Sequence, residues 1–226
     1  MDADAGDEGT VEGDEEETRA HAMGRLLAAR HEVGADPEPL HSLVNYAESA
    51  RAGDWTMRAA LVRLAQPDAM RASATVELIR RLDAALHPFT RALEQHTVRC
   101  DRLLSPAAIE HVSGEWELGE PAESAADTRV SDLARLHRID PVFADSVAAS
   151  YADVVTVSEE EYEALPLLCV AVAMDELGEV LATWASAGFR NPPLESVDRI
   201  GAEVFASLQR LGVPRESGPP GRGRRS

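Results

Sequence analysis

Apolar residues recur at the spacing of an α-helix along most of this 226-residue chain, and no other feature constrains its fold as strongly. The clearest case is the segment 73–94, where one stripe of an amphipathic helix is formed by Val76, Ile79, Leu82, Ala85 and Leu86. Aromatic residues make up only 4% of the chain, so the core must be built mainly from aliphatic side chains. The sequence therefore predicts a mainly α protein.

Start and stop signals divide the helical pattern into segments. The predicted helices span residues 18–32, 39–52, 55–65, 73–94, 129–137, 141–152, 159–187 and 194–211. Pro88 should kink the fourth of them. Ser158 and Glu161 form a capping box at the start of the seventh, and Gly212 closes the last. Residues 97–118 mix short apolar runs with turn residues, which predicts a small loop-and-hairpin region.

Both ends of the chain differ in composition from its middle. Residues 1–17 carry nine acidic side chains and no basic one, which predicts a disordered acidic tail. Residues 214–226 are rich in Gly, Pro and Arg and are predicted to form a disordered basic tail. Residues 18–213 are expected to form one helical domain.

Charge and cysteine usage exclude several classes of protein. The net charge of −18 would repel phosphate backbones, so nucleic acid is not expected as a partner. All 22 basic residues are arginine, so no lysine amine is available to bind a nucleotide phosphate. The two cysteines lack the spacing of a metal or redox motif, and the N-terminus is acidic, unlike a secretory signal. The longest apolar run, residues 165–174, is too short to span a membrane. These features predict a cytoplasmic protein without a membrane span.

Three strings stand in a fixed order along the chain: MGRLLAARHEVG at 23–34, SDLARL at 131–136, and a long helical segment at 140–184. In this order they resemble helical segments of the larger lobe of the aminoglycoside phosphotransferase family, a branch of the protein-kinase-like fold. The likeness extends over residues 20–213. It implies a kinase-like C-lobe helical domain with a small β-hairpin and a remnant of the catalytic loop. The β-rich N-lobe of the family is expected to be absent.

The resemblance also implies where the chemistry of the family would lie. Asp101 falls at the position of the catalytic Asp, which orients or deprotonates the substrate hydroxyl. Glu115 stands where the family has its metal-binding Asp. Asp132 matches an Asp that braces the catalytic loop, so it is predicted to be structural; a helix N-cap explains it equally well. Simpler interpretations exist for Asp101 and Glu115 as well. Asp101 would be a loop Asp with local backbone hydrogen bonds, and Glu115 an exposed hairpin Glu.

Residues around Asp101 depart from the pattern of the family. Arg99 and Cys100 replace the His and Gly of its catalytic loop, and residues 106–108 offer no metal-binding Asn. Cys100 itself is interpreted as a substituted loop residue. The alternative is a thiol whose pKa is lowered by the flanking Arg99 and Arg102. With lysine also missing, most of the electrostatic stabilisation that phosphoryl transfer needs would be absent.

The sequence therefore predicts a catalytically degenerate phosphotransferase-like protein. It would act as a non-catalytic partner or scaffold subunit that binds a phosphotransferase-type enzyme or its substrate, for example in natural-product or modified-peptide biosynthesis, and no cofactor is expected. The alternative is a weak or split small-molecule O-phosphotransferase, of the aminoglycoside type, that uses Asp101 and Mg-ATP. A third possibility is a truncated or mis-started reading frame of an ordinary phosphotransferase.

Overall fold

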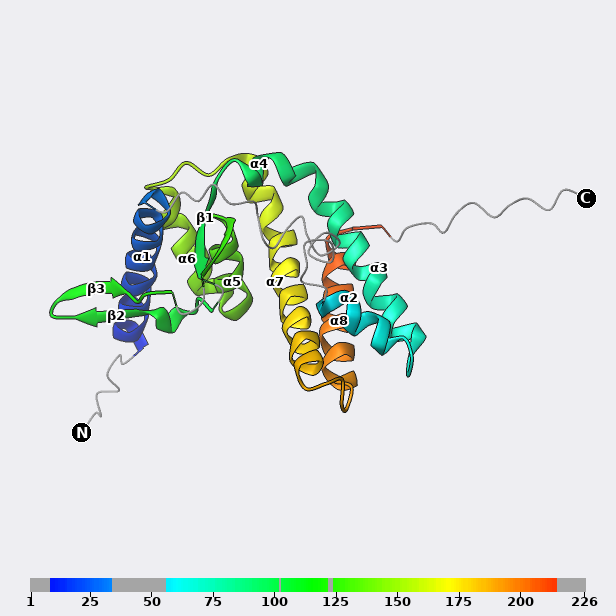
Figure 1. The fold of residues 1–226 in the computed structure, drawn as a ribbon. Helices are drawn as coiled ribbons and strands as arrows, with labels where there is room; N and C mark the ends of the chain where they lie inside the picture. The colour runs from blue at the N-terminus through cyan, green and yellow to red at the C-terminus, as the bar shows by residue number, and fades with distance from the viewer. Residues whose placement is uncertain (1–8, 34–55, 102, 122–123, 215–226) are drawn as a thin grey trace, which may run out of the picture. The chain divides into compact units, whose positions relative to one another are not determined.

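A computed structural model describes most of the chain and divides it into two compact units (Figure 1). The first unit comprises Met1–Ser42 and Phe89–Val172, and the second comprises Leu43–Pro88 and Ala173–Ser226. The residues described are 9–33, 56–101, 103–121 and 124–214.

The first unit combines helices with two small antiparallel sheets. In chain order its elements are α1 (Gly9–Val33), α4 (Thr90–Glu94), β1 (Thr97–Asp101), η2 (Pro106–Ala108), β2 (Ile109–Val112), β3 (Glu115–Leu118), β4 (Ser124–Thr128), α5 (Ser131–Ile139), α6 (Pro141–Ala152) and the first part of α7 (Glu159–Ser186). The prediction of a mainly α protein is confirmed.

The sheets of the first unit each have two strands. β1 pairs with β4, so that Asp101 lies opposite Ser124, and β2 pairs with β3. The β2–β3 turn contains Ser113 and Gly114, whose φ angles of 54° and 94° suit the tight turn of a hairpin. The predicted hairpin region is confirmed, whereas β4 was not expected as a strand.

Helix α1 packs against α6 in the core of the first unit. Met23 and Leu27 of α1 and Tyr151 of α6 are fully buried. α1 begins at Gly9, nine positions before the predicted start at Thr18, so part of the predicted acidic tail is helical.

The second unit contains α2 (Thr56–Leu64), α3 (Ala69–Leu86), the remainder of α7 and α8 (Leu194–Arg210). The predicted stripe of α3 is buried at Ile79, Leu82 and Leu86. α3 ends before Pro88 instead of being kinked by it, because proline has no N–H to continue the helix, and the 3-10 turn η1 (His87–Phe89) leads into α4. The predicted helix 39–52 lies outside the described residues.

Several predicted helix ends are confirmed. Ser158 and Glu161 form the capping box: the Ser158 amide donates to Glu161 Oε2 (2.8 Å) and the Glu161 amide donates to Ser158 Oγ (3.2 Å). Gly212 follows α8 with a φ of 70°. In the described ranges, no helix has both the length and the apolar character that a membrane crossing needs.

Candidate functional site: a buried polar network

Asp132 lies at the centre of a group of buried polar side chains in the first unit. It occupies the first turn of α5, whose N-cap residue is Val130, so it does not cap the helix. Its carboxylate lies 3.2 Å from His31 Nε2 of α1 and accepts a hydrogen bond from Arg135 Nη1, also at 3.2 Å. Since the Asp132 side chain is fully buried, these contacts join α1 to α5 inside the core.

Two further side chains complete what we call the buried polar network, formed by His31, Asp127, Asp132, Arg135 and Tyr151. Arg135 Nη2 donates to Asp127 Oδ2 (3.0 Å), and His31 Nδ1 lies 2.9 Å from the Tyr151 hydroxyl. Burial disfavours the charge on Arg135, but the adjacent Asp127 and Asp132 carboxylates outweigh this effect and raise the pKa of its guanidinium. Burial raises the pKa of Tyr151 as well, so its hydroxyl remains neutral.

Cys100 lies beside this network in β1. Its thiol is fully buried and donates a hydrogen bond to the Thr128 carbonyl (3.3 Å). Burial raises the pKa of the Cys100 thiol well above its ordinary value, and the negative charges of Asp132 and Asp127 raise it further. The alternative of a thiol pKa lowered by flanking arginines is therefore wrong, because the side chain of Arg99 is exposed on the strand and burial dominates. Cys100 also lies in a strand, not in the loop that the sequence predicted.

His31, Cys100 and Asp132 each place a possible metal-ligand atom within 4.8 Å of the other two. A nitrogen, a sulfur and a carboxylate oxygen would suit zinc better than magnesium, which prefers oxygen ligands. However, both ring nitrogens of His31, the Cys100 thiol and the Asp132 carboxylate already have hydrogen-bond partners. A metal ion would have to displace these bonds. Together they connect five elements: α1, α5, α6, β1 and β4.

The structure places Asp101 and Glu115 in different sheets. Asp101 ends β1, is only 5% exposed, and accepts a hydrogen bond from the Leu103 amide through Oδ1 (3.0 Å). Glu115 is exposed and begins β3, opposite Val112 at the turn of the hairpin. Because the hairpin projects away from β1 and α5 in Figure 1, Glu115 does not share a site with Asp101.

The β2–β3 hairpin is fastened to α1 at both of its ends. Arg19 donates to the Pro106 carbonyl just before β2. Arg30 Nη2 donates to the carbonyls of Leu118 (3.2 Å) and Gly119 (2.6 Å) at the end of β3. No local pattern indicates these contacts, because the donors and acceptors are separated by 87 to 89 residues.

The outer part of the hairpin presents two different faces. By strand pairing, Glu110 lies opposite Glu117, and Val112 opposite Glu115, on one face. On the other face the rings of His111 and Trp116 lie 4.9 Å apart between their centroids. Apart from the half-buried Trp116, these side chains are exposed, so the hairpin carries an acidic face and an aromatic face outside the core.

Arg129 and Glu161 form a second buried ion pair in the first unit. Arg129 Nε and Nη2 donate to the two oxygens of Glu161 at 2.8 and 2.7 Å, and Nη2 also donates to the Thr156 carbonyl. Glu161 was identified from the sequence only as a capping residue. The Glu161 carboxylate therefore accepts hydrogen bonds both from the Ser158 amide at the start of α7 and from Arg129, which directly follows β4.

No protein-family model matches the chain, and no curated protein matches its sequence. The resemblance to aminoglycoside phosphotransferases therefore depends on the three strings alone.

Proposed function

We propose that this chain is a non-catalytic, protein-binding subunit that uses the β2–β3 hairpin as its docking surface. One observation carries the proposal: the hairpin is anchored at both ends by Arg19 and Arg30, while its outer side chains remain exposed. A two-stranded hairpin is at best marginally stable alone in water. Anchoring by α1 keeps the hairpin ordered before a partner binds, which reduces the entropy lost on binding.

The hairpin is suited to a partner that adds a strand. A free strand edge can pair with an extended segment through backbone hydrogen bonds, and the side chains then select the sequence. Glu110, Glu115 and Glu117 favour a segment with basic side chains, since none of them takes part in an ion pair among the residues the structure describes. The pair of His111 and Trp116 offers an aromatic anchor on the opposite face.

The resemblance to phosphotransferases adds a class of partner to this proposal. It favours a phosphotransferase-type enzyme, or the protein substrate of one, as the molecule that binds the hairpin. Asp101 supports a non-catalytic role for the chain itself, because its carboxylate is buried and accepts a hydrogen bond from the Leu103 amide. A catalytic base needs direct access to the substrate hydroxyl.

Site-specific photocrosslinking tests the docking surface. A photoreactive residue replaces Glu117 on the hairpin or, as a matched control, the exposed Glu163 on α7. In cells that make the protein, we expect one cross-linked protein from position 117 and none from position 163, with loss of the product on Trp116→Ala. Equal products from both positions, or a product that survives Trp116→Ala and charge reversal at Glu110, would refute the docking surface.

A thermal melt with and without millimolar Mg-ATP tests the non-catalytic part. A nucleotide present at about 100 times its dissociation constant would stabilise the fold by about 2.7 kcal/mol. We expect no shift in melting temperature. A clear shift that disappears in Asp101→Asn would favour the O-phosphotransferase alternative instead.

A further inference from the structure

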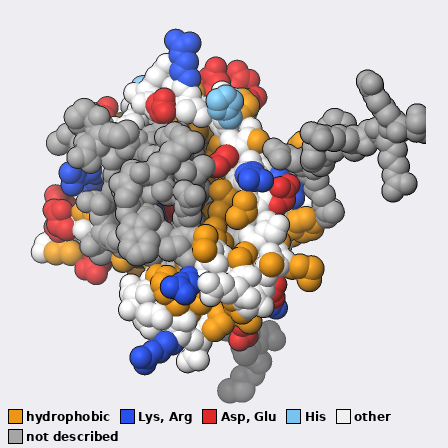
Figure 2. Space-filling model, turned by 45° about the vertical axis from the view of Figure 1, so that its right-hand side comes forward, with side chains coloured by type: hydrophobic (Ala, Val, Ile, Leu, Met, Phe, Trp, Pro, Cys, Tyr) orange, Lys and Arg blue, Asp and Glu red, His pale blue; other side chains and the backbone are white. Residues whose placement is uncertain are grey.

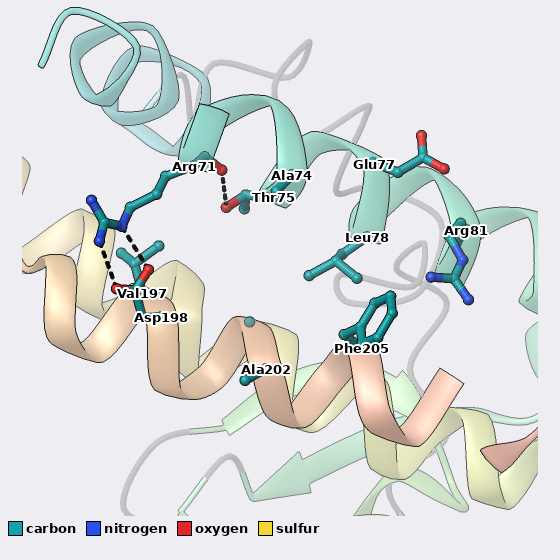
Figure 3. Close-up of a pocket in the computed structure, with 11 residues that line it drawn as sticks. Arg71, Ala74, Thr75, Glu77, Leu78, Arg81, Val197, Asp198, Ala202 and Phe205 are labelled. Atoms are coloured by element: carbon teal, nitrogen blue, oxygen red, sulfur yellow. Dashed lines mark hydrogen bonds and ion pairs between the residues drawn. The ribbon is translucent and has the colours of Figure 1, made fainter. Parts of the chain in front are cut away.

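The second unit contains a cavity of about 420 Å³ between α3 and α8 (Figure 3). Cavities of this size fall within the range of roughly 300–1,000 Å³ that small-molecule sites occupy. Its walls are mainly apolar, and the residues that line it include Leu78, Val197, Ala202 and Phe205. Figure 2, which turns the α3 and α8 side of Figure 1 forward, shows that hydrophobic side chains are exposed on this face.

Small residues keep the floor of the cavity open. Gly201 on α8 has no side chain, and a Cβ placed on it would meet only Leu78 Cδ1, at 3.9 Å. Ala202 follows it on α8, and Ala74 lies across from them on α3. The space therefore results from small side chains on both helices.

The two ends of the cavity differ in charge. At one end Arg71 forms a two-point ion pair with Asp198, with Nε–Oδ1 at 2.6 Å and Nη2–Oδ2 at 2.8 Å. Arg71 also donates from Nη1 to the Asp68 carboxylate, so this end has one cation and two carboxylates. At the other end Arg81 is only 3% exposed. Arg81 donates from Nε to the Pro214 carbonyl (3.2 Å) and from Nη2 to the Val213 carbonyl (2.7 Å), and it lies over the Phe205 ring.

Arg81 is a buried cation without a carboxylate partner among the described residues. Glu77, one turn earlier on α3, also lines the cavity, but its carboxylate points away from α8 in Figure 3 and makes no ion pair with Arg81. Two carbonyls and an aromatic ring satisfy part of the guanidinium but do not neutralise it, and the hydrogens on Nη1 take part in neither of these bonds. A buried charge without a counterion is costly, so an anion in the cavity would be strongly favoured.

We propose that this cavity binds a small organic carboxylate with a linear apolar chain. The carboxylate would accept hydrogen bonds from Arg81, and the chain would extend along Leu78 and Ala202 toward Val197. The lining of α3 from Arg71 to Arg81 covers about 15 Å of helix, which accommodates an extended eight-carbon chain. An amine is disfavoured because both carboxylates at the far end, Asp68 and Asp198, are already paired with Arg71.

Calorimetric titration of the full chain with three eight-carbon probes tests the proposal. Octanoate, octanol and octylamine share a chain and differ in the head group. We expect octanoate to bind at least ~10-fold more tightly than octanol, because a charge-assisted hydrogen bond contributes about 1.5–3 kcal/mol and 1.4 kcal/mol is tenfold in affinity. Octylamine should bind no more tightly than octanol. Equal affinities of octanoate and octanol, or no saturable binding of octanoate, would overturn the proposal.

Three variants locate the binding. Gly201→Leu should fill the cavity and abolish octanoate binding, whereas Gly201→Ala, which fits without a clash, should bind within a few-fold of the original. Arg81→Met should reduce octanoate affinity to that of octanol. Arg81 also bonds the carbonyls of the chain after α8, so Arg81→Met could weaken the fold as well as binding. Gly201→Leu avoids this problem because it leaves the Arg81 guanidinium in place. Undiminished octanoate binding by Gly201→Leu would rule out this cavity, and neither outcome bears on the hairpin.

Discussion

Gly24 of α1 lies directly against the backbone of Tyr151 in α6: a Cβ added to Gly24 would come within 2.9 Å of the Tyr151 amide nitrogen and would overlap the Val147 carbonyl oxygen. These are backbone atoms, so they cannot move aside as the end of a flexible side chain can. The two helices approach this closely only because residue 24 has no side chain.

Gly24→Ala should therefore destabilise the protein although alanine favours helices. We expect a loss of about 1–3 kcal/mol, the usual range for an overpacked core. Gly201→Ala is the matched control, since its Cβ has room; it should leave stability unchanged or raise it by up to ~1 kcal/mol through helix propensity. Urea denaturation of both variants measures the difference. If both variants gained stability, the close approach of α1 and α6 would be wrong.

Replacing Glu161 should lower the free energy of unfolding and should change how that free energy depends on pH in acid. Removing one partner of a buried ion pair costs about 3–5 kcal/mol, and Glu161→Gln removes the charge that Arg129 binds. Burial raises the pKa of Glu161, but the hydrogen bonds from Arg129 and Ser158 outweigh this effect and hold the pKa below its ordinary value of 4.5.

Because the pKa of Glu161 is lower in the folded state than in the unfolded state, its stabilisation is complete above about pH 5 and lost as the pH falls through the folded pKa. Denaturation at several pH values should show this loss in the original chain and not in Glu161→Gln. Ser158→Ala is the control: it should lose ~1 kcal/mol of capping and keep the acid dependence. An identical acid dependence in Glu161→Gln would contradict the assignment.

Asp83 of α3 should have the opposite dependence on pH. Its Oδ1 is buried and has no hydrogen-bond partner among the described residues, and burial raises its pKa from 3.8 to about 6. A raised pKa means that folded protein is destabilised as the pH rises from 3.8 through 6. The free energy of unfolding of Asp83→Asn should equal that of the original protein below this pH window. At pH 7 it should be higher by ~1 kcal/mol, after allowance for solvent screening of this half-buried group. A constant difference at every pH would contradict this cause.

Cys100 should be unreactive until the protein unfolds. Its thiol is buried and its pKa is raised, while burial raises the pKa of Cys169 to about 11. At pH 8 the Cys169 thiol, with its pKa of about 11, should react about 100-fold more slowly than a free thiol of pKa near 8.5, because only the thiolate is nucleophilic. Cys100 should also react slowly, since its thiol is fully buried. Labelling with a thiol reagent in Cys169→Ser isolates Cys100, and Cys100→Ser isolates Cys169. Rapid native labelling of Cys100 would contradict its burial.

Local signals in the sequence predicted the helices well. α6 begins and ends as predicted, because Asp140 caps it by accepting from the Phe143 amide (3.0 Å) and Pro141 occupies its first turn. The capping box of α7 and the glycine after α8 were predicted on the same grounds. Each of these features depends on residues within one turn of one another, which a sequence displays directly.

Features that depend on distant contacts could not be predicted. β4 consists of small and polar residues with weak strand propensity, and it forms through pairing with β1. His31 was not among the predicted site residues, yet it contacts Asp132, 101 residues later. Asp132 was expected to be structural, but no local pattern indicated that its partners would be His31 and Arg135.

The pairing of α1 with α6 also affects the order in which the protein can fold during synthesis. His31 and Tyr151 are 120 residues apart, so α1 leaves the ribosome long before its main packing partner exists. At typical rates of translation this delay is on the order of ten seconds. During that interval the apolar stripe of α1 has no core to enter, and the acidic residues at the start of α1 would keep the nascent chain soluble by mutual repulsion.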